Sequence, residues 1–301
     1  MNSLQHIWQK NSPGFLLAFV RFLLQPKSYK IRRKATFEYY KKFDQKTLHP
    51  GIKECLNYLK CHKYSAFPYK WTQKYDNLMP EVYFDDENQT YYNLFNGKKM
   101  YFPKHFSRAM VIWAVRSILK EQDINSPHIY LTRDFQLEPG SIVLDAGVAE
   151  GNFALTVVEQ AKRLYLVECD SEWMQALKLT FAPWKDKVVF VEKHMSDKPG
   201  DTTTSIDTLL IAEESESYFI KMDIEGYEKL ALAGMKNLLA SGRPIKMNVC
   251  TYHHPNDLID IEKVVKSYGF EWHVSEGFVL YSLPGEQPTF RKVLIRAEKN
   301  K

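Results

Sequence analysis

Glycines and acids that suit nucleotide binding lie close together near the middle of the chain. Gly147 and Gly151 bracket a short turn, Asp145 precedes that turn, and Glu168 closes the second of two apolar segments. Glycine tolerates positive φ and lets a ligand approach the backbone. An acid about 20 residues beyond such a turn can accept hydrogen bonds from two ribose hydroxyls. The spacing predicts a nucleotide site, and the plainer alternative is a glycine turn in some other α/β protein.

The residues inside the turn indicate which nucleotide it suits. A dinucleotide turn follows the pattern G-x-G-x-x-G, and its middle glycine lets a pyrophosphate lie on the backbone. This chain has Ala149 at that position, and the neighbouring Glu150 would repel a diphosphate. Asp145 instead suits a cationic group, such as the amino group of S-adenosylmethionine (SAM). The turn therefore favours SAM and disfavours a nucleotide-dependent dehydrogenase.

The elements that must position these residues alternate between strand and helix. Apolar runs predict strands, and between them amphipathic stretches predict helices, which together indicate a mostly parallel sheet. The predicted strands are 142–144, 163–167, 187–191, 218–222 and 245–251, followed by 271–275, 278–282 and 290–296. The predicted helices are 152–162, 171–181, 227–240 and 256–268. Ligands of such sheets bind beyond the carboxyl ends of the strands.

The first 130 residues differ in composition from the rest. Residues 1–50 contain ten Lys/Arg against two acids, so the net charge of +5 is concentrated there. We expect residues 1–60 to be mostly helical. Their apolar run 15–24 is about half the ~20 residues of a membrane span. Packing on the same chain or on a second subunit is favoured over contact with an anionic membrane surface.

Between this arm and the first strand, the sequence predicts a hairpin and a helix. Asn96-Gly97 separates two aromatic runs, which is a two-residue hairpin signal. The apolar spacing over 108–122 predicts a helix. Four aromatic residues nearby suit stacking on a sugar ring, although core packing is the commoner role of such residues: Tyr91, Tyr92, Tyr101 and Trp113. We divide the chain into an N-terminal region, 1–130, and a nucleotide-binding domain, 131–301.

Several motifs in the second region resemble the FkbM family of SAM-dependent O-methyltransferases. They are LDAGVAEGNF at 144–153, LVECDSEW at 166–173, HMSDKPG at 194–200, TTSIDTLL at 203–210, FIKMDIEGYEKLALAGM at 219–235 and RPIKMNV at 243–249. The resemblance implies a class I methyltransferase (Rossmann-like) fold of about seven strands, the last one antiparallel. It also implies methylation of a hydroxyl, often on a sugar or a natural product. Two departures are Val148-Ala149-Glu150 in the turn and Cys169 where the family usually has proline.

The cofactor-binding residues are expected around this turn and the next two loops. Glu168 is the predicted ribose acid, and the adjacent Cys169 is also predicted to bind the cofactor. Asp145 is the predicted partner of the amino group. Four residues are predicted to surround the methionine part: Gly147, Gly151, Asn152 and Phe153. His194 or Met195 is predicted to flank the adenine.

Candidates for the chemistry follow the fourth and fifth predicted strands. A sugar hydroxyl is a poor nucleophile at neutral pH, so a base or a metal should assist. If the chain stays extended, Asp223 and Glu225 point the same way and suit a divalent cation such as Mg²⁺ or Mn²⁺. Alternatively, Glu225 simply begins the next helix, where the dipole favours an acid. His253 is the predicted base, since Pro255 places His254 in a cap region.

The sequence therefore predicts a SAM-dependent O-methyltransferase that modifies a sugar, either a sugar nucleotide or a precursor of a surface or capsular polysaccharide. The alternatives are a catalytically silent SAM-binding scaffold and a methyltransferase for another small molecule. Nucleic acid is not expected as a partner, because no Asn/Asp-Pro-Pro-aromatic motif follows the fourth strand. Four cysteines without scaffold or CxxC spacing indicate reduced thiols in a cytoplasmic protein. A homo-oligomer is left open.

Overall fold

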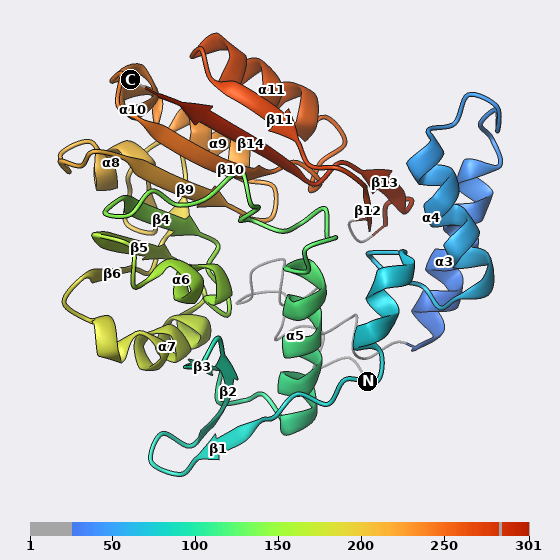
Figure 1. Ribbon diagram of the computed structural model, residues 1–301, viewed down its shortest axis with the longest axis horizontal. Coiled ribbons are helices and arrows are strands. Elements are labelled where there is room, and N and C mark those ends of the chain that lie inside the picture. Colours follow the sequence, from blue (N-terminus) through green and yellow to red (C-terminus); the bar gives the residue numbers. More distant parts are fainter. Residues whose placement is uncertain (1–25, 283–284, 301) are drawn as a thin grey trace.

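A seven-stranded sheet forms the centre of the molecule, with helices on both faces (Figure 1). The computed structural model describes residues 26–282 and 285–300. The strands lie in the order β6-β5-β4-β9-β10-β14-β11, and β14 runs antiparallel to both of its neighbours. Their bounds are β4 Ile142–Ala146, β5 Arg163–Val167, β6 Val188–Val191, β9 Tyr218–Met222, β10 Ile245–Cys250, β11 Glu271–Val274 and β14 Leu294–Lys299. The topology expected from the resemblance is confirmed.

Both faces of the central strands are covered, which explains why these strands read as continuous apolar runs. In β4, Val143 packs into the core on one face, while Ile142 and Leu144 pack into the core on the other. The first face carries α6 (Asn152–Val157) and α7 (Ser171–Thr180). The second carries α8 (Ile206–Leu210), α9 (Glu228–Ala233), α10 (Lys236–Ala240) and α11 (Asp257–Ser267).

Two predicted helices are shorter than their sequence patterns indicate. The helix predicted over 152–162 ends at Val157, because the following backbone turns to join the strands: Gly140 N–H donates to Gln160 O. The helix predicted over 227–240 is divided into α9 and α10 at Gly234. A Cβ on Gly234 would lie 2.3 Å from the carbonyl oxygen of Ser196, so the close approach of that loop requires glycine.

The strand predicted over 290–296 is also two elements. β13 (Thr289–Arg291) pairs with β12 (Val279–Tyr281) in a separate two-stranded ribbon, whereas β14 joins the main sheet. Thr251 bonds the backbone between them, since its N–H donates to Val293 O and its hydroxyl donates to Lys292 O. A further short pair, β7 (His194–Met195) and β8 (Thr203–Thr204), lies after β6.

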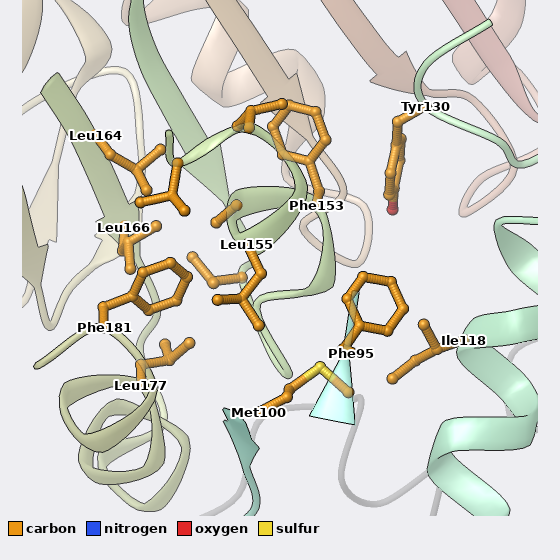
Figure 2. Close-up of a cluster of buried hydrophobic side chains, with 14 of the residues drawn as sticks. Phe95, Met100, Ile118, Tyr130, Phe153, Leu155, Leu164, Leu166, Leu177 and Phe181 are labelled. Atoms are coloured by element: carbon orange, nitrogen blue, oxygen red, sulfur yellow. The ribbon is translucent and has the colours of Figure 1, made fainter. Parts of the chain in front are cut away.

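The predicted hairpin and helix in the N-terminal region are confirmed, and they share a core with the sheet domain. β1 (Tyr83–Asp85), β2 (Thr90–Phe95) and β3 (Lys98–Tyr101) form a small sheet, and α5 spans Arg108–Glu121. Asn96 and Gly97 have φ of 50° and 75°, as a two-residue hairpin turn requires. Figure 2 shows Met100 next to Leu155 of α6, and Ile118 of α5 next to Phe95 of β2.

The N-terminal helices α3 (Pro26–Tyr40) and α4 (Pro50–Cys61) pack on the ribbon of β12 and β13. Leu59 is fully buried with Phe278 and Phe290, and Phe290 N–H donates to the hydroxyl of Tyr40 at 2.8 Å. These two helices thus pack on the same chain. The apolar run 15–24 lies outside the described residues. Within the part of the chain that the structure describes, no helix has the length and apolarity to cross a bilayer.

Candidate functional site

A cavity of about 340 Å³ opens beyond the carboxyl ends of β4, β5, β9 and β10. Aromatic residues contribute part of its wall: Tyr130, Trp173, Tyr227 and Tyr252. Six carboxyl groups line it, against two lysines among the lining residues. The carboxyl groups belong to Glu121, Glu150, Glu168, Asp170, Asp223 and Glu225. Such a lining attracts cations and repels a pyrophosphate.

The glycine turn after β4 is held against the end of β9. A Cβ on Gly147, where φ is 72°, would lie 1.9 Å from Asp223 O, so the close approach of the two chains requires glycine. Lys221 of β9 donates to Gly147 O at 2.6 Å and to Ala146 O at 3.3 Å. The buried ammonium of this lysine therefore fixes the turn that forms one wall of the cavity.

The same lysine binds Asp145, which was expected to bind the amino group of the cofactor. Lys221 Nζ lies 2.9 Å from Asp145 Oδ1, and both side chains are almost fully buried. Asp145 is absent from the residues that line the cavity. Its carboxylate neutralises Lys221 instead, so the direct contact predicted for Asp145 does not fit the structure.

Glu168 lines the cavity where a ribose acid was predicted. Its Oε2 accepts the N–H of Ala149 at 3.1 Å, and its Oε1 accepts the N–H of Asp170 at 2.9 Å. Burial raises the pKa of the Glu168 carboxyl despite these donors. Each oxygen keeps further lone pairs, since an ionised carboxylate has about four acceptor sites. This count leaves lone pairs for two hydroxyl donors.

Asp223 sits at the centre of a network of polar side chains. Its oxygens accept hydrogen bonds from the hydroxyls of Tyr130, at 2.8 Å, and Tyr252, at 3.1 Å. His128 Nε2 lies 3.4 Å from its Oδ2. Burial alone would raise the pKa of Asp223, but the contact with His128 and the charges of His128, His253 and Lys221 hold it well below its usual range. Asp223 therefore stays ionised and is a weak proton acceptor.

His253 lies behind this network and does not line the cavity. Its Nδ1 is 2.9 Å from Glu228 Oε1, and its Nε2 is 3.4 Å from Asp223 Oδ1. Burial alone would lower the pKa of His253, but the charges of Glu228, Glu225 and Asp223 raise it to about 10. An imidazolium has no lone pair to accept a proton. The role of base predicted for His253 is therefore corrected: the residue is a buried cation between carboxylates.

Glu225 is not in an extended chain, so the reason for pairing it with Asp223 does not hold. Its φ is 54°, and at Gly226, where φ is 97°, a Cβ would lie 2.4 Å from the ring of His254. Both Glu225 and Asp223 still line the cavity. Among the described residues, two groups of three metal-ligand types lie within 4.8 Å: His128, Asp223 and Cys250, and Asp223, Glu228 and His253. Glu225 is in neither group.

Three carboxyl groups of the cavity were not predicted as site residues: Glu121, Glu150 and Asp170. Burial raises the pKa of Glu121, at the end of α5, and of Glu150, in the glycine turn, to about 7 in each case. A group with such a pKa exchanges a proton readily near neutral pH. Glu121 had no local signal in the sequence, because only packing brings the end of α5 to the cavity.

Among the remaining predicted site residues, five line the cavity and two do not. The five are Gly147, Asn152, Cys169, His194 and Met195. Gly151 and Phe153 lie outside the lining, where Phe153 packs in the core against Tyr130 and Phe219. The aromatic residues considered for stacking on a sugar belong to the hairpin strands and to α5, pack in or against the core, and are not in the lining: Tyr91, Tyr92, Tyr101 and Trp113. Sequence reasoning missed His128, Tyr130, Lys221 and Tyr252.

Comparison with known proteins finds similarity to methyltransferases. Residues 164–272 match the methyltransferase FkbM domain. No curated protein matches the sequence. Among solved structures, a methyltransferase FkbM from Methylobacillus flagellatus is 16% identical with a TM-score of 0.44, over 62% of this chain and 54% of its own. The chain thus spans about half the length of that protein. Magnesium protoporphyrin IX methyltransferase from Synechocystis with bound SAM is 16% identical, with a TM-score of 0.39 over 63% and 84% of the two chains.

Proposed function

We propose that this chain, whose residues 164–272 match the methyltransferase FkbM domain, transfers a methyl group from SAM to a hydroxyl of a sugar. The acceptor class we propose is a sugar nucleotide or a precursor of a surface polysaccharide. The observation that carries the proposal is the acidic cavity at the carboxyl ends of the strands, with Glu168 held in its wall. The alternatives are a methyltransferase for another small molecule and a silent SAM-binding scaffold.

The charge of the cavity and its hydrogen-bonding groups suit SAM. SAM is cationic at its sulfonium and amino groups, and the lining holds six carboxyl groups. Glu168 would accept the ribose hydroxyls, Gly147 and Asn152 would face the methionine part, and His194 with Met195 would flank the base. When bound, SAM supplies the electrophilic methyl group, so the protein contributes alignment and a proton acceptor.

We assign the proton acceptor to Glu121. Of the cavity carboxyls, Asp223 is held ionised by its partners and is a weak base, whereas burial raises the pKa of Glu121 to about 7. Glu121 would accept the proton that the acceptor hydroxyl loses as its oxygen gains the methyl group and the bond between that methyl group and the sulfonium sulfur breaks. Glu121→Gln should lower turnover by at least about a hundredfold while leaving cofactor affinity intact, because general bases contribute factors of this size. Unchanged turnover would remove this assignment.

The walls around these carboxyls support a sugar acceptor. Tyr227 is 52% exposed at the cavity, and Tyr252 and Tyr130 present their rings and hydroxyls near Asp223. Aromatic faces beside carboxylate acceptors suit a ring that carries many hydroxyl groups. The same walls suit other hydroxylated small molecules, so an acceptor screen must decide between them.

A divalent cation bound by Asp223 and Glu225 is a separate part of the proposal. Carboxylate oxygens suit Mg²⁺ or Mn²⁺, and both side chains line the cavity. Turnover in EDTA tests this directly. Loss of turnover with intact cofactor binding, restored by Mg²⁺ or Mn²⁺, would support the cation, and full turnover in EDTA would leave the proton transfer to Glu121 alone.

The deciding experiment is calorimetric titration with S-adenosylhomocysteine, with NAD as the control. We expect micromolar binding of S-adenosylhomocysteine and none of NAD, followed by transfer of radiolabelled methyl from SAM to members of a sugar-nucleotide panel. Absence of binding would overturn the cofactor assignment. Transfer only to non-sugar hydroxyl compounds, tested in a second panel, would favour the other small-molecule methyltransferase. Binding without transfer in either panel would favour the silent SAM-binding scaffold.

A further inference from the structure

Glu150 lies in the glycine turn and lines the cavity, whereas Asp145, the predicted partner of the amino group of SAM, does not. We infer that the carboxylate of Glu150 binds the α-ammonium group at the methionine end of the cofactor. This inference rests on the proposed function, because it concerns the same cavity and the same cofactor. It identifies a residue that determines specificity for a ligand with a free amino group.

The first step is that Asp145 is already paired. Its carboxylate lies 2.9 Å from the ammonium of Lys221, and neither side chain is more than 4% exposed. A second ammonium would have to displace Lys221 from a site where that lysine also holds Gly147 O. Removing one partner of a buried ion pair is strongly unfavourable. The amino group of the ligand therefore needs another carboxylate.

Most other carboxylates of the cavity are also engaged. Glu168 accepts two backbone N–H groups, Asp170 accepts those of Glu172 and Trp173 at the start of α7, and Asp223 accepts two tyrosine hydroxyls. Glu225 accepts the hydroxyl of Tyr281 at 3.4 Å. Glu121 and Glu150 are the two cavity carboxyls for which no hydrogen bond to another residue is found among the described residues.

Position decides between these two. Glu150 lies in the turn itself, between Ala149 and Gly151, which have φ of 45° and 80°. Ala149 N–H is the group that binds Glu168, the ribose acid. Because the ribose and the amino acid end of the cofactor are joined by a short chain, a carboxylate one residue from this contact is well placed. Glu121 reaches the cavity from α5, on the side of His128.

The surroundings of Glu150 should make its affinity for an ammonium group depend on pH. The charged groups that act on it are Lys221, Glu168 and Asp223, and Glu121 lies close enough to interact with it. Burial is the main cause that raises the pKa of the Glu150 carboxyl to about 7. The carboxylate is therefore charged above pH 7 and loses its charge as the pH falls to 6. The affinity for an ammonium group should fall in the same interval.

The experiment compares two ligands and two variants by calorimetry. S-adenosylhomocysteine carries the α-ammonium group, and 5′-methylthioadenosine lacks the whole amino acid part. We expect Glu150→Gln to weaken S-adenosylhomocysteine binding at pH 8 about tenfold or more and to leave 5′-methylthioadenosine unchanged, as loss of a charge-assisted bond predicts. In the unsubstituted protein, S-adenosylhomocysteine should bind several-fold more weakly at pH 6 than at pH 8, and Glu150→Gln should remove most of this difference.

The outcomes separate this inference from the proposed function. No binding of S-adenosylhomocysteine by the unsubstituted protein would overturn the cofactor class. Binding that is unaffected by Glu150→Gln would overturn the inference alone. The inference would also be overturned if Glu121→Gln, the matched variant, lowered the affinity for S-adenosylhomocysteine and Glu150→Gln did not. It would likewise be overturned if Glu150→Gln weakened the binding of both ligands equally. Thermal unfolding of each variant verifies that it is folded before titration.

Discussion

At the scale of single residues, hydrogen-bond and charge partners give the acids of one cavity different protonation behaviour. Asp223 contacts two tyrosine hydroxyls and two histidines. Burial alone would raise its pKa, but His128, His253 and Lys221 hold it well below the usual range. Glu121 lacks such donors, and burial raises its pKa to about 7. Groups whose environments push their pKa values apart suit different roles in catalysis.

Glu168 should contribute directly to cofactor affinity. Glu168→Ala removes the acceptor for the ribose hydroxyls, and hydrogen bonds to a charged group contribute about 1.5–3 kcal/mol each. We expect S-adenosylhomocysteine to bind at least about tenfold more weakly in calorimetry. Glu168→Gln, which keeps the shape and one acceptor oxygen, is the control and should lose less. Equal affinity of Glu168→Ala and the unsubstituted protein would exclude the ribose contact.

His253 should make stability depend on pH. Its pKa is raised from the ordinary 6.5 to about 10 in the folded protein. The stabilisation from its ion pairs is thus fully present below pH about 6.5, the unfolded pKa, and is lost as the pH rises through about 10. The difference in unfolding free energy between the unsubstituted protein and His253→Gln should therefore shrink from pH 7.5 to 10. Denaturant unfolding at several pH values measures it, and a constant difference would contradict the buried imidazolium.

At the scale of elements, the site depends on how closely the loops after β4 and β9 approach each other. Gly147 leaves no space for a side chain against Asp223 O, and Lys221 of β9 donates to the carbonyl of the same glycine. The turn and the loop of Asp223 are thus one rigid unit. This unit places the turn of Glu150 and the network of Asp223 on neighbouring parts of the cavity wall.

Gly147→Ala should disrupt this unit. A Cβ would lie 1.9 Å from Asp223 O at a φ of 72°, so we expect a loss of about 2–5 kcal/mol in unfolding free energy from overpacking and backbone strain together. Gly97→Ala is the matched control, since Gly97 has a φ of 75° and no atom within 4 Å of a built Cβ. It should lose only about 1–2 kcal/mol. Denaturant unfolding measures both losses. Equal losses of unfolding free energy in the two variants would show that the contact of the new Cβ with Asp223 O does not destabilise the protein.

At the scale of the whole molecule, the N-terminal helices are linked to the cavity through the C-terminal ribbon. α3 and α4 pack on Phe278 and Phe290 of the β12–β13 region. Tyr281 of β12 donates to Glu225 in the cavity wall. Segments from the two ends of the described chain therefore support one side of the site.

The packing of α4 on the β12–β13 ribbon should contribute strongly to stability. Leu59 of α4 is fully buried against the ribbon, and Leu→Ala substitutions at such positions cost about 2–5 kcal/mol. We expect Leu59→Ala to lower the unfolding free energy by this amount. The control is Leu94→Ala in β2, where the side chain is 47% exposed. If both substitutions had the same small effect, α3 and α4 would not be packed on the ribbon.

The sequence by itself determined the order of strands and helices, the glycine turn and the acid after the second strand. Strands buried on both faces need continuous apolar residues, and a ligand turn needs glycine, so both features are written locally. Breaks at Gly234 and after Val157 were not visible, because a distant loop and the return to the sheet cause them.

Only the tertiary structure decided which acids face the cavity and in which protonation state. Lys221 and Asp145 are 76 residues apart in sequence yet form one ion pair, which removes Asp145 from the cavity. Glu121 reaches the cavity only because α5 packs beside the sheet domain. The physical reason is that burial and long-range charge partners set the pKa of a carboxyl group, and neither is encoded in the residues beside it.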